Sequence, residues 1–156
     1  MPWKECIIMI AIACDHRGYK MKEEIKKFLD EHNIKYTDYG TYSEERMDYP
    51  EKAKEVSLAI QEGKAEKGIL ICGTGLGMSI AANKFKGIRC TVCYNEDVAR
   101  YAKKHNDSNI LALGAEVTTI SQAIEIVRVW LATEFEGERH RRRIEMIKEI
   151  ENTNFK

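Results

Sequence analysis

The sequence ILICGTGLG, residues 69–77, decides the fold of this chain. An apolar β-rich run ends on Cys72, a glycine-rich turn follows at once, and residues 78–84 are typical of the opening of a helix. A strand, a glycine turn and a helix N-terminus together present unpaired backbone N–H groups to an anion. A thiol at the end of the strand lies in the same positive field, which favours its thiolate. The stretch therefore indicates an enzyme that holds a negative oxygen while a cysteine moves a proton.

Apolar runs and amphipathic stretches alternate from one end of the chain to the other. Strands are predicted at residues 7–13, 34–39, 68–72, 88–94 and 109–113. Helices are predicted at residues 19–32, 51–62, 76–85, 96–104, 119–133 and 138–151. Nearly continuous apolar strands that alternate with helices indicate a parallel sheet covered on both faces. We expect an α/β fold: a Rossmann-like three-layer sandwich of about five parallel strands, plus a C-terminal helix, in a single domain over residues 1–156.

Composition narrows the class of protein. The 156 residues are 44% hydrophobic and 32% charged, with 25 basic and 25 acidic side chains, so net charge gives no reason to expect nucleic acid or a membrane as a partner. The longest apolar run, residues 6–14, is too short to span a bilayer and lacks a signal-peptide cleavage site. Five cysteines, an odd number spread over apolar segments, indicate reduced thiols and a cytoplasmic protein. The sequence leaves open whether Met1 or Met9 is the native start.

Three polar clusters lie just outside predicted strands. Asp15-His16 follows the first strand and Cys72 ends the third, which places both at the carboxyl edge of the sheet. His105-Asn106 precedes the fifth strand, nominally at the opposite edge, and a dimer could deliver His105 into the cleft of a neighbour. Each has a plain alternative: Asp15 as a helix cap, Cys72 as a small buried apolar residue, and His105 as a surface residue at a helix C-terminus.

Other patterns are weaker. Arg139 and Arg143 share one helix face, as two phosphate-binding guanidinium groups would, but His140-Arg141-Arg142 beside them also fits a solvated basic patch. Cys90 and Cys93 lie three apart in a strand and face opposite sides, so we reject a metal or redox pair there.

The glycine turn lacks the third glycine of the dinucleotide pattern and the Lys of a P-loop, which weakens the case for a nucleotide site.

Several ordered blocks resemble one known family. Residues 72–84, CGTGLGMSIAANK, closely resemble the signature of the type B ribose-5-phosphate isomerases, which are grouped with the galactose-6-phosphate isomerase subunits. The other matching blocks, in order, are residues 14–16, 40–42, 48–50, 105–109 and 137–140. The resemblance runs from about residue 9 to residue 150 and leaves residues 1–8 outside as an N-terminal extension.

The resemblance implies a sugar-phosphate substrate and a role for each matching residue. Cys72 is similar to the base that moves a proton between C1 and C2 through an enediolate, and His105 is similar to the group that opens the sugar ring. Thr74 resembles part of the anion hole. The implied substrate-binding residues are Asp15, His16, Gly73, Gly75, Leu76, Gly77, Asn106, Arg139 and Arg143. The resemblance implies no cofactor, no metal, and a homodimer whose active sites use both subunits; pairing of dimers into tetramers stays open.

Three positions depart from the family pattern. Glu116 stands where many relatives carry a phosphate-binding arginine, Glu138 replaces a common glycine, and Arg17 adds a positive charge that we hypothesise compensates for Glu116. The expected reaction is the interconversion of ribose 5-phosphate and ribulose 5-phosphate (EC 5.3.1.6). The alternatives are isomerisation of a six-carbon sugar phosphate such as allose or galactose 6-phosphate, a non-catalytic phosphate- or nucleotide-binding module, and a redox-sensing role for Cys72.

Overall fold

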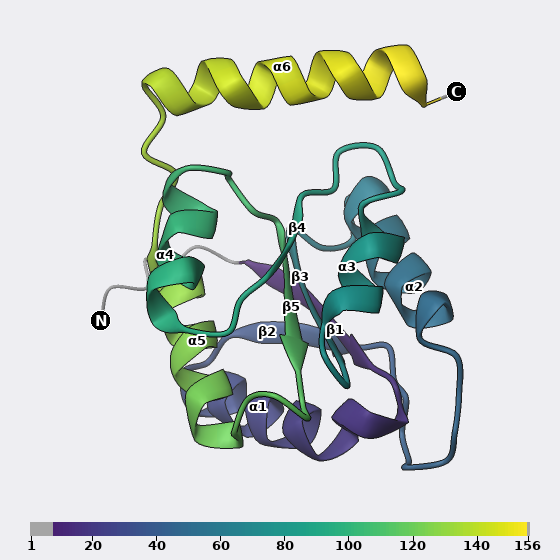
Figure 1. The fold of residues 1–156 in the computed structure, drawn as a ribbon. Helices are drawn as coiled ribbons and strands as arrows, with labels where there is room; N and C mark the ends of the chain where they lie inside the picture. The colour runs from purple at the N-terminus through teal and green to yellow at the C-terminus, as the bar shows by residue number, and fades with distance from the viewer. Residues whose placement is uncertain (1–7, 156) are drawn as a thin grey trace.

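The computed structural model describes residues 8–155, and its centre is one five-stranded sheet in which every pair of neighbouring strands is parallel (Figure 1). The spatial order is β2-β1-β3-β5-β4. The strands are β1 Met9–Cys14, β2 Lys35–Asp38, β3 Lys67–Cys72, β4 Cys90–Val92 and β5 Ile110–Gly114. The predicted α/β class and parallel sheet are confirmed. The predicted first strand began at Ile7, which lies outside the described residues.

Seven helical segments connect and flank these strands within residues 8–155. They are the short 3-10 helix η1 His16–Gly18 and the α-helices α1 Tyr19–Glu31, α2 Tyr49–Gln61, α3 Leu76–Ala82, α4 Glu96–Lys104, α5 Ile120–Ala132 and α6 Arg139–Asn154. The prediction for α3 was three residues too long. Its end has a local cause: the Asn83 side chain accepts a hydrogen bond from the Cys90 N–H and donates one to the Cys90 carbonyl, which ties the chain to the start of β4.

Alternate residues of each strand divide the interior into two apolar layers. Ile12, Ile69 and Leu111 face the layer that contains residues of α1, α4 and α5. Ala13, Leu70 and Ala112 face the layer that contains residues of α2 and α3. Because both faces of the sheet are covered, the inner strands β1, β3 and β5 are apolar at nearly every position, as the sequence pattern indicated. The edge strand β2, with the sequence KYTD, is polar and partly exposed.

The strand order places a topological switch point at the carboxyl ends of β1 and β3, and we call this position the carboxyl-edge crevice. From β1 the chain passes outward to β2 on one side, and then returns to β3 on the other. Cys14 pairs with Ile71, so the residues that follow β1 lie beside the residue that ends β3. This switch point is where open α/β sheets bind their ligands.

Helix α6 lies outside the three layers, across the end of the molecule where the strands begin (Figure 1). Ile144 is buried, and the Glu151 carboxylate accepts a hydrogen bond of 2.8 Å from the Gly87 N–H. Met146, Ile147 and Ile150 on the same helix are exposed. In the part of the chain that the structure describes, α6 and the other helices lack the combination of length and apolar composition that a membrane span requires.

Candidate functional site

The turn after β3 folds back on the Cys72 sulfur. The Gly75 N–H donates a hydrogen bond of 3.1 Å to Sγ, and the Leu76 N–H donates one of 3.2 Å to the Thr74 hydroxyl oxygen. Gly75 has a φ of 84°, a left-handed conformation that favours glycine, and this conformation closes the turn. The backbone of the turn thus contacts the sulfur directly.

Neighbouring segments hold the carbonyl groups of this turn. The Cys72 carbonyl accepts a hydrogen bond from Ala115 N–H, the Gly73 carbonyl accepts one from Glu116 N–H, and the Thr74 carbonyl accepts one from the Tyr94 hydroxyl. The N–H groups of Gly73 and Thr74 make no hydrogen bond to other residues in 8–155. The turn therefore has its carbonyl acceptors occupied and two N–H donors, those of Gly73 and Thr74, free, which is the electrostatic requirement for binding an anion.

The other described cysteines differ from Cys72 in their surroundings. Burial raises the pKa of Cys14 and of Cys90 to about 12, and that of Cys93 to about 11. These three are protonated packing residues at neutral pH. Cys90 and Cys93 belong to the layers on opposite faces of the sheet, which confirms the rejection of a Cys90–Cys93 pair. Cys72 is itself only 5% exposed.

Asp15 lies directly beside this turn, because its N–H donates to the Ile71 carbonyl at 3.0 Å. Its Oδ1 accepts hydrogen bonds from the N–H groups of Arg17 and Gly18, so the helix-cap interpretation is correct for this oxygen. Oδ2 makes no hydrogen bond within residues 8–155 and is available to a hydroxyl group. Asp15 therefore serves the local fold and still offers an acceptor to the crevice.

His16 follows at the same edge. Its Nδ1 accepts a hydrogen bond of 3.3 Å from the Met47 N–H, which assigns the proton of the neutral ring to Nε2. The contact ties the loop before α2 to the crevice. A ring with a protonated Nε2 can donate a hydrogen bond to a phosphate oxygen.

Arg17 and Glu116 form an ion pair over the turn. The Arg17 guanidinium and the Glu116 carboxylate approach to 2.9 Å, and both side chains are about half exposed. A Cβ built on Gly73 would lie 3.2 Å from atoms of both side chains, so the pair covers the backbone next to Cys72. The positive charge of Arg17 is thus shared with Glu116 at the rim of the crevice.

A second group of predicted residues gathers around the end of α4. His105 caps α4 at its C-terminus and stacks on His140, with ring centroids 4.1 Å apart and the planes 14° apart. The stack brings the first turn of α6, with exposed Arg139 and Arg143, next to His105-Asn106. An imidazole and two guanidinium groups in this arrangement can hold a phosphate and transfer a proton.

The two groups lie at opposite edges of the sheet. Gly68 pairs with Ile110 at one end of the β3–β5 ladder, and Cys72 pairs with Gly114 at the other. His105 precedes Ile110 in the chain, so at least four residues of strand, about 13 Å, separate its edge from that of Cys72. This placement of His105 agrees with the prediction. Within one chain, the structure does not bring together Cys72 and His105.

Sequence reasoning missed two residues of the second group. It considered the His140 side chain only as part of an alternative solvated basic patch and gave it no role, but the side chain is only 5% exposed. Burial lowers the pKa of the His140 imidazole, and the nearby His105 and Arg139 lower it further. It also gave no role to Glu136, whose N–H donates to the Lys104 carbonyl beside His105. The apolar Ile144, one helical turn after His140, was the signal that this side of α6 turns inward.

Taken together, the fold and the carboxyl-edge crevice define an α/β protein of the kind that binds small phosphorylated ligands, with a cysteine at the anion-binding turn. Residues 10–147 match the family described as Ribose/Galactose Isomerase. The chain belongs to this family.

Individual relatives agree over almost their whole length. Ribose-5-phosphate isomerase B of Escherichia coli is 49% identical over 142 residues, which are 91% of this chain and 95% of that protein. The solved Clostridium thermocellum ribose-5-phosphate isomerase B superposes with a TM-score of 0.92 at 47% identity, covering 94% of this chain and 99% of that one. The Mycoplasma genitalium ribose-5-phosphate isomerase B with bound ribulose-5-phosphate gives a TM-score of 0.89 at 38% identity, covering 92% and 96%.

Proposed function

We propose that this chain is an aldose–ketose isomerase that interconverts ribose 5-phosphate and ribulose 5-phosphate through an enediolate. The observation that carries the proposal is the hydrogen bond of 3.1 Å from the Gly75 N–H to Cys72 Sγ, at the crevice between β1 and β3. The E. coli relative named ribose-5-phosphate isomerase B and the bound ribulose-5-phosphate in the M. genitalium structure support this choice of substrate.

In the proposed reaction, His105 gives a proton to the ring oxygen while the anomeric hydroxyl loses its own, which opens the sugar. The Cys72 thiolate then takes the proton from C2 and returns it to C1, while the hydroxyl proton moves between O2 and O1. The free N–H groups of Gly73 and Thr74, with the N–H of Gly77, stabilise the negative oxygen of the enediolate. The N–H groups of Gly75 and Leu76 hold the Cys72 sulfur and the Thr74 hydroxyl in place beside it. Atoms and electrons balance without an oxidant, a cofactor or a metal.

The remaining roles follow from position. The Asp15 carboxylate and the Asn106 amide bind sugar hydroxyls. His16, Arg139 and Arg143 bind the phosphate, with the two arginines one helical turn apart on α6. These assignments divide into a carboxyl-edge half-site, formed by Asp15, His16 and the turn 72–77, and an amino-edge half-site, formed by His105, Asn106, Arg139 and Arg143.

We infer a homodimer with shared active sites, because the two half-sites lie at opposite edges of the sheet within one chain. Each chain lends its amino-edge half-site to the carboxyl-edge half-site of the partner. The exposed apolar side chains of α6, Ile147 and Ile150, and those of α3, Leu76 and Ile80, are surfaces that such an assembly would bury. Light scattering distinguishes this dimer from a tetramer formed by two of them.

We place this single-domain enzyme in the cytoplasm. Within residues 8–155, Cys14, Cys72, Cys90 and Cys93 are all free thiols, as expected in a reducing compartment.

The activity is tested with the purified protein, a metal chelator, and a panel of ribose, allose and galactose phosphates in deuterated water. We expect conversion of ribose 5-phosphate with deuterium incorporated at C1 of the ketose, because a thiol exchanges its proton with solvent. Turnover of only a six-carbon substrate would move the assignment to that sugar. If the wild type and the Cys72→Ala variant bound sugar phosphates equally well, and the wild type converted none of them, the protein would be a binding module instead.

Shared sites are tested by mixing two inactive variants, Cys72→Ala and His105→Ala. A mixed dimer carries one site with both defects and one site with neither. Random exchange therefore restores about a quarter of wild-type activity. If each site were built from one chain, mixing would restore nothing.

A further inference from the structure

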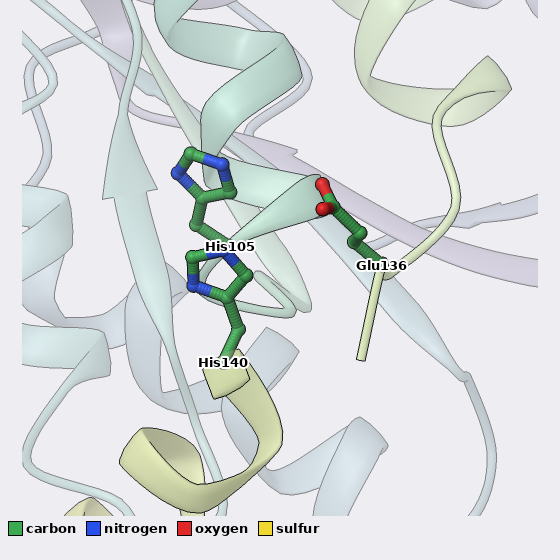
Figure 2. Close-up of side chains that lie close together, drawn as sticks. All are labelled: His105, Glu136 and His140. Carbon is green, nitrogen blue, oxygen red and sulfur yellow. The ribbon is translucent and has the colours of Figure 1, made fainter. Parts of the chain in front are cut away.

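His105, Glu136 and His140 form a cluster outside the carboxyl-edge crevice. Figure 2 shows the imidazole rings of His105 and His140 one above the other, with the Glu136 carboxylate to one side of them. One ligand atom from each residue lies within 4.8 Å of the other two. Two imidazole nitrogens and one carboxylate are a donor set that zinc uses in proteins, with a fourth position left for water.

A second observation points to a ligand at this place. His140 is buried, and its Nε2 has no hydrogen-bond partner among the residues that the structure describes. A buried imidazole nitrogen without a partner costs free energy, so such an atom is ordinarily explained by a bound group.

The three residues come from separate segments of the chain, and backbone hydrogen bonds hold these segments close together. His105 ends α4, and Glu136 is held beside it because the Glu136 N–H donates to the Lys104 carbonyl at 3.1 Å. The His140 N–H donates to the Gly137 carbonyl at 3.0 Å, which fixes the start of α6. A tetrahedral zinc site places its ligand atoms about 3.3 Å apart, so modest side-chain rotation brings these groups into range. One ring must leave the stacked arrangement for both nitrogens to reach the same ion.

Neighbouring charges set the strength of the site. Arg139 and Arg143 oppose a cation, while the Glu136 carboxylate attracts one. The cluster therefore has charges of both signs around the place where a cation would bind.

We propose that His105, Glu136 and His140 bind a divalent transition-metal ion such as Zn²⁺, and that the bound ion inhibits the enzyme by occupying His105. The inhibitory part rests on the proposed function, because it assigns ring opening to His105. The metal-binding part stands on the geometry of the cluster. A metal on the imidazole takes the lone pair that ring opening needs, and it draws the His105 ring away from the sugar.

Binding is measured with Co²⁺ added to untagged protein, by visible absorption, and with Zn²⁺ by calorimetry. We expect one ion per chain with low-symmetry N/O coordination and no cobalt–thiolate absorption. Glu136→Gln keeps the shape of an exposed side chain and should weaken binding at least tenfold. Glu145→Gln removes the same charge from an exposed position on α6 and should leave binding unchanged. Equal affinity in wild type and Glu136→Gln, or a thiolate spectrum, would overturn the site.

Inhibition is measured separately on ribose 5-phosphate. Zn²⁺ should inhibit the wild type and Glu145→Gln alike, chelator should restore activity, and Glu136→Gln should keep its basal activity while needing at least tenfold more Zn²⁺. An ion that binds the cluster and leaves turnover unchanged would overturn the inhibitory role alone. A protein inactive on every sugar phosphate would overturn the proposed function, while the cobalt spectrum would still decide whether the metal site exists.

Discussion

The two half-sites of this molecule are built in different ways. At the carboxyl edge, the groups around Cys72 are backbone N–H donors fixed by strand ends and a glycine turn, such as the Gly75 N–H that donates to the sulfur. At the amino edge, the functional groups are long or aromatic side chains, and they depend on a stack between His105 and a helix that lies outside the three layers (Figure 1). The carboxyl edge is thus preorganised by the fold, whereas the amino edge is organised by one tertiary contact and, in the proposed dimer, by the partner.

Replacing Cys72 by Ala tests the carboxyl edge most severely. Loss of the proposed base should lower kcat by about a thousandfold or more, with little change in KM, because the phosphate contacts stay in place. Steady-state kinetics on ribose 5-phosphate measure the effect. Cys93→Ala, which removes a buried thiol from the other layer, should keep kcat within about twofold. An active Cys72→Ala enzyme would contradict the assignment.

Placing charged side chains on the apolar side of α6 tests whether the amino-edge half-site needs dimer formation to act. Ile147→Asp combined with Ile150→Asp introduces carboxylates at positions that the proposed dimer buries, so we expect monomers and a loss of activity of about a hundredfold. Light scattering gives the mass and kinetics give the activity. Glu149→Gln, an exposed polar change on the same helix, should remain dimeric and active. A fully active monomer would show that each chain completes its own site.

Arg17→Ala tests how much the positive charge at the rim of the carboxyl edge adds to phosphate binding, beyond the arginines of the amino edge. Without Arg17, the Glu116 carboxylate stands unpaired beside Gly73 and repels a phosphate. Because both side chains are half exposed, we expect KM to rise only about two- to fivefold, with kcat nearly unchanged. The double variant Arg17→Ala/Glu116→Gln should recover much of this loss. Unchanged KM in Arg17→Ala would dispose of the hypothesis that Arg17 compensates for Glu116.

The difference between a backbone-built carboxyl edge and a side-chain-built amino edge explains which features the sequence predicted. Strand, turn and helix start are local patterns, so residues 69–77 were sufficient to place Cys72 and its donors. The displacement of His105 from Cys72 followed from the topology of parallel strands. In contrast, the His105–His140 stack joins residues 35 positions apart, and the Arg17–Glu116 pair joins residues 99 positions apart. Such contacts depend on how α6 and the loop after β5 pack. The periodic pattern of apolar residues along the sequence gives no information about that packing.

The smallest expected effect concerns Lys103, a buried side chain that packs close to His105 and contributes to the stability of the amino edge. Its ammonium is buried two residues before His105, donates to the Trp130 carbonyl at 3.2 Å, and lies 4.9 Å from the centre of the Trp130 ring. Burial, together with the nearby charge of Lys67, lowers the pKa of Lys103 to about 7. The unfolded chain has a lysine pKa of about 10.4, so between these values it binds more protons than the folded chain. The contribution of Lys103 to the free energy of unfolding therefore rises with pH from about 7 to about 10.4 and is least favourable below pH 7.

Lys103→Met keeps the length of the side chain and removes this titration. Urea unfolding should show the variant more stable than wild type at pH 6.5, by about 1–3 kcal/mol, with the advantage shrinking toward pH 9.5 as wild-type Lys103 loses its proton. Taking the difference between the two proteins cancels the titration of all other groups that the substitution leaves unaltered. Lys104→Met, at the adjacent and more accessible position, should show a small difference with no such slope. A Lys103→Met advantage that stayed constant across this pH range would mean that Lys103 is charged in the folded protein throughout, and that the amino edge rests on a buried ammonium instead of a neutral amine.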